Sequence, residues 1–352
     1  MSEDDYKAFE GEYHYEAYRR ADLRDHFGSF KEQKTLYSRI VNEIQYFAWL
    51  YQELRTDYST ASEHLFCNKL LEQNQQYLLI MSAVSLNDPQ RENKIRTISA
   101  KFDQLHVILR ILDLYESNKF QALIYELNNS LRNKIEPECR QVFDDLVIRI
   151  LQDAQRLEQT FGRTIADVFS YEQMKGARNS GANFSKYLLM RIDRWLSQLL
   201  DKPSYCMETL PTLEERFNKT NRRRYGMHLE HIYAYHNVNR ALFTDPGTGV
   251  FDGAAFEQTR NLLGMVLLLK DLQNLSSNND IYRDKLNDYA MSDIIWNQLL
   301  AGHLPVVDAK ILPEAFKHGA VPPDGSGAFP KDRVEQRQRL FFEAVKAVWS
   351  QV

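Results

Sequence analysis

Apolar residues recur at three- and four-residue steps through much of the N-terminal half of the chain, which is the spacing of one helix face. The clearest case is the segment 31–55, whose apolar face consists of Leu36, Ile40, Ile44, Phe47, Leu50, Tyr51 and Leu54. The same spacing predicts helices over 62–86, 95–115, 120–131, from Pro137 to Leu157, and over 184–200. We therefore expect an α-helical domain over residues 1–205, with the apolar stripes as its core.

The pattern changes near residue 224, where short apolar runs replace the long helical stripes. Met227 to Tyr233 and Leu263 to Leu269 have the length of strands. The Pro- and Gly-containing stretch 245–253 between them predicts a loop. A polar helix start in the segment 276–289 is followed by apolar residues at helical spacing. Two strands, a loop and a helix predict a small ββα unit at about 224–289.

Beyond this unit the chain is expected to return to helices. Residues 292–300 predict a short helix, 305–330 a breaker-rich loop, and 333–349 a final amphipathic helix. The predicted second domain is therefore 206–352. The predicted fold class is mainly α: a helical N-terminal domain, a small ββα unit and C-terminal helices.

Composition limits the kind of protein this can be. The chain has 352 residues, enough for two domains, and a formal net charge of −4, so any contact with nucleic acid has to be local. The triplet Arg222, Arg223 and Arg224 could make such a contact through phosphates, or could be a solvated turn. Three widely separated cysteines predict neither a disulfide framework nor a structural zinc site. An acidic N-terminus without a long apolar run predicts no membrane span and a cytoplasmic protein.

The segment around Glu230 and His231 carries the residue types that phosphodiester hydrolysis needs. The reaction requires a base that deprotonates water and a cation that stabilises charge on the phosphate and the leaving oxygen. The His231 imidazole suits the base, because its ordinary pKa is about 6.5. Glu230 and Asn274 offer the oxygen ligands that Mg²⁺ prefers, and Lys285 could add positive charge near the phosphate. Taken alone, Lys285 could equally be a solvated helix residue.

These residues, in this order, resemble the HNH, or ββα-metal, nucleases. More narrowly, they resemble the nuclease domain of GmrSD-type modification-dependent restriction endonucleases. The matching positions are Glu230, His231, Ile232, Asn261, Gly264, Leu268, Leu269, Asn274, Ser277, Asn279, Tyr282, Lys285 and Tyr289. The resemblance implies that His231 is the general base and that Glu230 and Asn274 hold Mg²⁺, with Mn²⁺ as an alternative. It also implies that Lys285 lies beside the phosphate.

Two positions depart from the family pattern. Ala234 stands where the family has a proline, and Met265 stands where it has an asparagine after the glycine. In HNH sites an asparagine at this point usually braces the loop that carries the base, and Asn261 or Asn237 could replace it. His236 and Asn279 are further supporting candidates, although a packed or surface role is favoured for His236.

The resemblance extends more weakly to the helical part of the chain. The segments 78–84 and 187–192 resemble the helical region of GmrSD-type proteins, whereas neither a P-loop nor the sensor-domain motif is found. The implied partner is a separate nucleotide-dependent sensor subunit. Val334 to Arg337 resembles the start of the family's closing helix, and we expect Arg337 to pair with a carboxylate.

The expected function is that of a metal-dependent DNA endonuclease acting in restriction or phage defence against modified DNA. An RNase or a nicking enzyme would use the same residues. A degenerate HNH module that serves as a binding or scaffold subunit is the non-enzymatic alternative, which Ala234 and Met265 favour. The sequence leaves open whether one subunit acts alone or as a homodimer.

Overall fold

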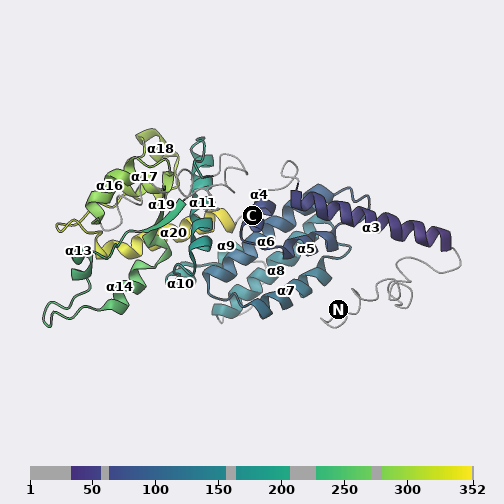
Figure 1. The fold of residues 1–352 in the computed structure, drawn as a ribbon, viewed down its shortest axis with the longest axis horizontal. Coiled ribbons are helices and arrows are strands. Elements are labelled where there is room, and N and C mark those ends of the chain that lie inside the picture. Colours follow the sequence, from purple (N-terminus) through teal and green to yellow (C-terminus); the bar gives the residue numbers. More distant parts are fainter. Residues whose placement is uncertain (1–32, 57–62, 156–163, 207–226, 271–279, 351–352) are drawn as a thin grey trace.

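The computed structural model describes residues 33–56, 63–155, 164–206, 227–270 and 280–350 (Figure 1). Helices make up most of these residues, and the strands β1 and β2 form a two-stranded sheet. The prediction of a mainly α fold is therefore confirmed. None of the described helices is long and apolar enough to cross a membrane.

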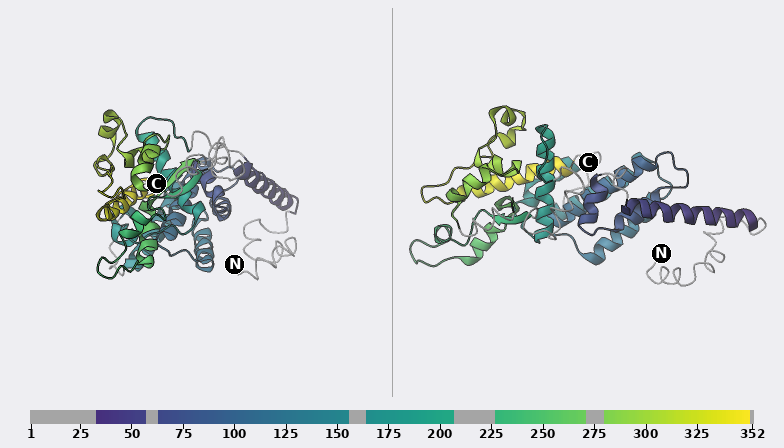
Figure 2. Two further views of the ribbon diagram at one scale, coloured as in Figure 1. Left: turned by 60° about the vertical axis from the view of Figure 1, so that its left-hand side comes forward. Right: turned by 45° about the horizontal axis from the view of Figure 1, so that its top comes forward.

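The N-terminal part consists of helices packed around α6, which contacts α4, α5 and α8. Their bounds are α3 Gln33–Thr56, α4 Glu63–Leu70, α5 Gln75–Ala83, α6 Arg91–Ile111, α7 Ser117–Leu131 and α8 Glu136–Gln155. The first of these, α3, projects from the end of the bundle in each view (Figures 1 and 2). The short helices α9 (Ile165–Val168) and α10 (Tyr171–Met174) lead to α11 (Ala182–Leu199).

The single helix expected over 62–86 is instead two helices, α4 and α5. Glu72 lies between them in a left-handed conformation, with φ of 58°. The Asn68 carbonyl accepts hydrogen bonds from the amides of Leu71 and Gln73 at 3.1 and 3.0 Å. These bonds close a turn that ends α4, so the apolar stripe continues on a second helix with a new direction.

The C-terminal part begins with the antiparallel strands β1 (Met227–His231) and β2 (Val266–Lys270). Met227 is opposite Lys270, and His231 is opposite Val266. Between the strands lie α13 (Asn237–Ala241), α14 (Gly253–Arg260) and the 3-10 turn η3 (Leu263–Met265). After β2 come α16 (Tyr282–Ala290), α17 (Ile295–Ala301), α18 (Val306–Ile311), α19 (Glu314–Lys317), η4 (Lys331–Arg333) and α20 (Val334–Trp349).

Three expectations for this part are corrected. β2 begins at Val266, because the first residues of the apolar run form η3. The loop expected at 245–253 ends in α14, since the Asp252 carboxylate accepts the Ala255 amide at 2.9 Å and caps the helix. The loop expected at 305–330 contains α18 and α19. In the last two cases, residues interpreted as breakers are helix starts.

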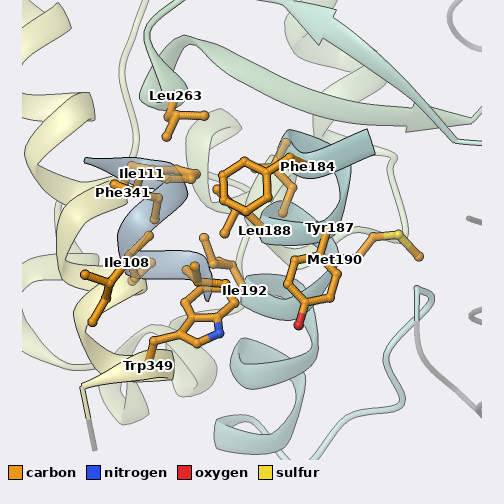
Figure 3. Close-up of a cluster of buried hydrophobic side chains, with 14 of the residues drawn as sticks. Ile108, Ile111, Phe184, Tyr187, Leu188, Met190, Ile192, Leu263, Phe341 and Trp349 are labelled. Atoms are coloured by element: carbon orange, nitrogen blue, oxygen red, sulfur yellow. The ribbon is translucent and has the colours of Figure 1, made fainter. Parts of the chain in front are cut away.

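The two parts of the chain meet at α11 and α20, as Figure 1 shows. Side chains of α6, α11, η3 and α20 converge in one buried cluster, of which Figure 3 labels Ile108, Ile111, Phe184, Tyr187, Leu188, Met190, Ile192, Leu263, Phe341 and Trp349. Buried hydrophobic residues of both parts belong to one continuous core. The proposed division into two domains near residue 205 stays a prediction.

Gly264 allows η3 to lie directly against α20. A Cβ at this position would fall 2.8 Å from the Cα of Gln338 and 2.9 Å from the carbonyl carbon of Arg337. The Gly264 amide also donates to Gln338 Oε1 at 2.7 Å. Because the obstructing atoms are backbone, this close approach requires glycine, and it fixes the start of β2 relative to the closing helix.

Candidate active site

The candidate site lies at the C-terminal end of β1. Glu230 is opposite Leu267 in the strand pair, and His231 is the last strand residue. The Ile232 amide then donates to the Met265 carbonyl at 3.0 Å, which holds the chain where it leaves the strand. Glu230 is 5% exposed, whereas His231 is only partly buried. The strand end therefore presents two neighbouring side chains in different environments.

Lys285 of α16 reaches back to this strand end. Its ammonium contacts Glu230 Oε1 and donates to the His231 carbonyl at 3.3 Å. Because Lys285 is 1% exposed, it is not the solvated helix residue that was one alternative from the sequence. Burial raises the pKa of Glu230, and the Lys285 charge opposes that rise. Glu230 and Lys285 form a buried ion pair.

The tautomer of His231 follows from the orientation of Asn261. The Asn261 amide nitrogen donates to the Glu257 backbone carbonyl at 2.9 Å and to the Glu257 carboxylate at 3.2 Å. A backbone carbonyl can only accept, so the Asn261 oxygen must be the atom that lies 3.2 Å from His231 Nε2. Nε2 therefore carries the proton, and Nδ1 keeps its lone pair. Asn261 is thus brought to His231; that it braces the loop carrying the base, as Asn261 or Asn237 was expected to, stays a prediction.

The His231 ring is neutral in this environment. Burial lowers its pKa to about 4, and the nearby Arg260 guanidinium adds to this effect. The hydrogen bond with Asn261 acts in the opposite direction but does not outweigh them. Above about pH 4, His231 is therefore a neutral imidazole with its free lone pair on Nδ1.

Helix α14 supplies two further groups that the sequence interpretation missed. Arg260 donates through Nε to the Tyr233 carbonyl at 3.0 Å, and its guanidinium lies 4.3 Å from the centre of the Tyr235 ring. Glu257 orients Asn261, as described above. The signal that could have revealed them is Asp252, an N-cap residue, followed by Phe256 on the buried side of a helix.

The remaining sequence candidates lie elsewhere or outside the described residues. His236 caps α13, where its Nδ1 accepts the Val238 amide at 3.2 Å, so its role here is structural. Asn239 donates to the carbonyl of Ala234 at 2.9 Å and braces the chain at that residue. Asn237 is exposed. The predictions for Asn274, Asn279, Arg222, Arg223 and Arg224 fall outside the described residues.

No family model, curated protein or solved structure matches this chain. The site must therefore be interpreted from its own chemistry. Within the described ranges, no group of three or more His, Cys, Asp or Glu side chains gathers as a metal cluster would. Mg²⁺ often takes only one or two protein oxygens and completes its shell with water and phosphate. Glu230 offers such an ion one carboxylate ligand, which is already in contact with the Lys285 ammonium.

Arg337 on α20 differs from the expectation that it pairs with a carboxylate. It is 1% exposed and pairs with no carboxylate in the described part of the chain. Its Nε donates to the Gly264 carbonyl at 3.3 Å, and its guanidinium lies 4.1 Å from the centre of the Trp296 ring. Burial lowers its pKa to about 10. Arg337 joins α20 to η3 and α17, and among the described residues the predicted carboxylate pairing is not found.

Proposed function

We propose that this protein is a metal-dependent endonuclease of the HNH type that hydrolyses DNA phosphodiester bonds. The observation that carries the proposal is a neutral histidine at a strand end, held in one tautomer by Asn261 beside a buried carboxylate. A general base must be unprotonated at the working pH and must have a fixed lone pair. His231 meets both requirements through Nδ1.

In this proposal β1, β2 and α16 form the ββα unit, and each site residue has one task. His231 accepts a proton from the attacking water at Nδ1. Glu230 would hold Mg²⁺ or Mn²⁺, together with Asn274. A bound metal ion of this kind stabilises the negative charge that develops on the phosphate and the leaving oxygen. Arg260 and Lys285 place positive charge near His231, although each lies beside a carboxylate, Glu257 and Glu230 respectively.

The proposed biological setting is restriction of modified DNA in the cytoplasm. Recognition of the modification would come from a separate nucleotide-dependent sensor subunit. The triplet Arg222, Arg223 and Arg224 would contact DNA phosphates beside the site. Two copies acting as a homodimer would cut both strands, whereas one copy would nick.

The test is plasmid cleavage with Mg²⁺ or Mn²⁺, comparing the wild type with His231→Ala. The exposed His303 gives a matched control as His303→Ala. Unmodified DNA, DNA with glucosylated cytosine, and RNA are offered as substrates. We expect metal-dependent cutting that is lost in His231→Ala and kept in the control. Cutting that persists in His231→Ala would reject His231 as the base.

A second candidate function is a binding subunit without catalysis. The contact between Lys285 and Glu230 favours it, because the ammonium already neutralises the carboxylate that a metal ion would need. This candidate predicts DNA binding without cleavage under every metal condition. The plasmid assay combined with a DNA mobility-shift assay separates the two.

A further inference from the structure

Two lysines lie at the strand pair, and their ion pairs differ in environment. The Lys285 and Glu230 side chains are 1% and 7% exposed. Lys270, at the end of β2, pairs with Asp293, and these side chains are 32% and 57% exposed. Water screens the second pair but not the first. Lys285 is therefore a strongly bound counter-charge of Glu230, while Lys270 is a natural control with the same chemistry.

The position of Lys285 sets up a competition. A carboxylate in contact with an ammonium is already partly neutralised, and a divalent cation beside that ammonium is repelled by its charge. With little water around the pair, this repulsion is weakly screened. A cation that uses Glu230 must therefore overcome both the lost attraction and the new repulsion.

We propose that Lys285 sets the metal affinity of this site, by occupying the Glu230 carboxylate in the free protein so that a divalent cation binds only in competition with it. This inference rests on the proposed function. Under this inference Lys285 lowers the metal affinity of the site, instead of only adding positive charge beside the phosphate. A phosphodiester brings negative charge that offsets the excess positive charge, so metal and substrate bind with mutual reinforcement.

The test is a Mn²⁺ titration of the full chain, followed by calorimetry or by the electron paramagnetic resonance of free Mn²⁺. Lys285→Gln removes the charge and keeps an N–H donor for Glu230, so the carboxylate is not left unsatisfied. We expect Lys285→Gln to bind Mn²⁺ at least about tenfold tighter than the wild type. Lys270→Gln should leave the affinity unchanged, and Glu230→Gln combined with Lys285→Gln should abolish the gain.

The same titration is repeated with diethyl phosphate as the phosphodiester probe. Diethyl phosphate should tighten Mn²⁺ binding to the wild type and should do so less in Lys285→Gln, where less positive charge remains to be offset. Near-ultraviolet circular dichroism checks folding. If Lys285→Gln does not fold, Lys285→Met provides the charge deletion, and the effect of diethyl phosphate on the wild type remains an independent readout.

The outcomes separate this inference from the proposed function. Equal or weaker Mn²⁺ binding by a folded Lys285→Gln overturns the inference, even when the wild type cuts DNA through His231. Absence of Mn²⁺ binding in the wild type and every variant overturns both the inference and the metal-dependent mechanism. A tighter Lys285→Gln whose gain disappears with Glu230→Gln supports the competition.

Discussion

Two of the buried carboxylates, Asp103 in the helical part and Glu230 in the strand pair, are held in opposite ways. In the helical part, Asp103 is fully buried and accepts from Tyr187 Oη at 2.6 Å, His64 Nδ1 at 2.9 Å, Trp349 Nε1 at 3.1 Å and Arg191 at 3.2 Å. In the strand pair, Glu230 has the Lys285 ammonium as its hydrogen-bond donor in the described part of the chain. Asp103 is surrounded by partners on several helices, and Glu230 depends on one.

The pKa values of these carboxyl groups record the difference. Burial alone would raise the pKa of Asp103, but the Arg191 charge and the hydrogen bonds from His64 and Tyr187 hold it at about 2. For Glu230, burial outweighs Lys285 and raises the pKa. When hydrogen bonds and opposite charges lower a buried carboxyl pKa by more than burial raises it, the ionised carboxylate stabilises the fold. When burial outweighs the partners, the carboxyl pKa is raised. Raised carboxyl pKa values of this kind are common in functional sites.

The contributions of Asp103 and Glu230 to stability are compared most directly by replacing each carboxylate with its amide. Asp103→Asn leaves the buried Arg191 with only the partly exposed Glu63 as counter-charge, and we expect a loss of about 3 kcal/mol in the free energy of unfolding. Glu230→Gln also leaves a buried cation, Lys285, but should lose less, because burial already disfavours the charged form of Glu230 and the Gln oxygen still accepts from the ammonium. Urea unfolding at pH 7 measures both. Equal losses would show that the Glu230 pair stabilises the fold as much as the Asp103 network does.

Each part also contains a neutral histidine, fully buried His106 in the helical part and partly buried His231 at the strand end, and pH distinguishes their roles. His106 is packed among the rings of Tyr115, Phe120 and Phe184, and neither ring nitrogen has a hydrogen-bond partner in the described part of the chain. Burial lowers its pKa to about 4. The unfolded chain, with an ordinary value near 6.5, binds the proton first as the pH falls.

Stability supplied by the neutral His106 is therefore complete above about pH 6.5 and is lost as the pH falls toward 4. From this shift we expect a loss of about 3 kcal/mol in the free energy of unfolding between pH 7 and pH 4. His106→Leu should remove this pH dependence, so the wild type should lose stability relative to the variant as the pH falls from 7 to 4. If the difference in the free energy of unfolding between the two proteins does not change with pH, burial does not keep His106 neutral.

Helical spacing predicted most of the helices, because the apolar stripe of an amphipathic helix is a local property of the sequence. The final helix was expected over 333–349 and is observed as Val334–Trp349. Errors arose where local signals had two meanings. Asp252 and Gly253 were interpreted as part of a loop, although they start α14, and Glu72 turns the chain without a glycine or proline.

The candidate site was predictable in its types of residue but not in its contacts. Periodicity and spacing indicated that β1 and the helix carrying Lys285 belong to one unit. That Lys285 is buried against Glu230 depends on how α16 packs on the strand end, which is a tertiary property. Likewise, two asparagines were candidates to brace the loop that carries the base, and only the position of α14 shows that Asn261 contacts His231 while Asn237 is exposed.

Substitutions of Asn261 and Asn237 distinguish their roles, with the smallest stability change of these predictions. Asn261→Ala removes the acceptor that fixes the His231 tautomer, so we expect cleavage to fall about 10- to 100-fold while stability falls by about 1 kcal/mol. Asn237→Ala is the control and should change neither. The nitrogen NMR shifts of the His231 ring measure the tautomer directly and do not depend on activity. A ring that stays protonated on Nε2 in Asn261→Ala would show that another group fixes it.

Asn261→Asp tests the same contact by its charge. The introduced carboxylate accepts from Nε2 with one oxygen, while its other oxygen replaces the donor to Glu257, so Asn261→Asp is combined with Glu257→Gln to remove the repulsion between the two carboxylates. The new charge favours the charged imidazole, and the pKa of His231 should rise from about 4 toward its ordinary value. The cleavage rate of the variant should then fall below about pH 6.5, where the wild-type His231 ring is still unprotonated. If the acidic limb of the pH profile is the same in both proteins, His231 does not supply the base. In that case the tautomer set by Asn261 has only a structural role, as the Asp103 network has.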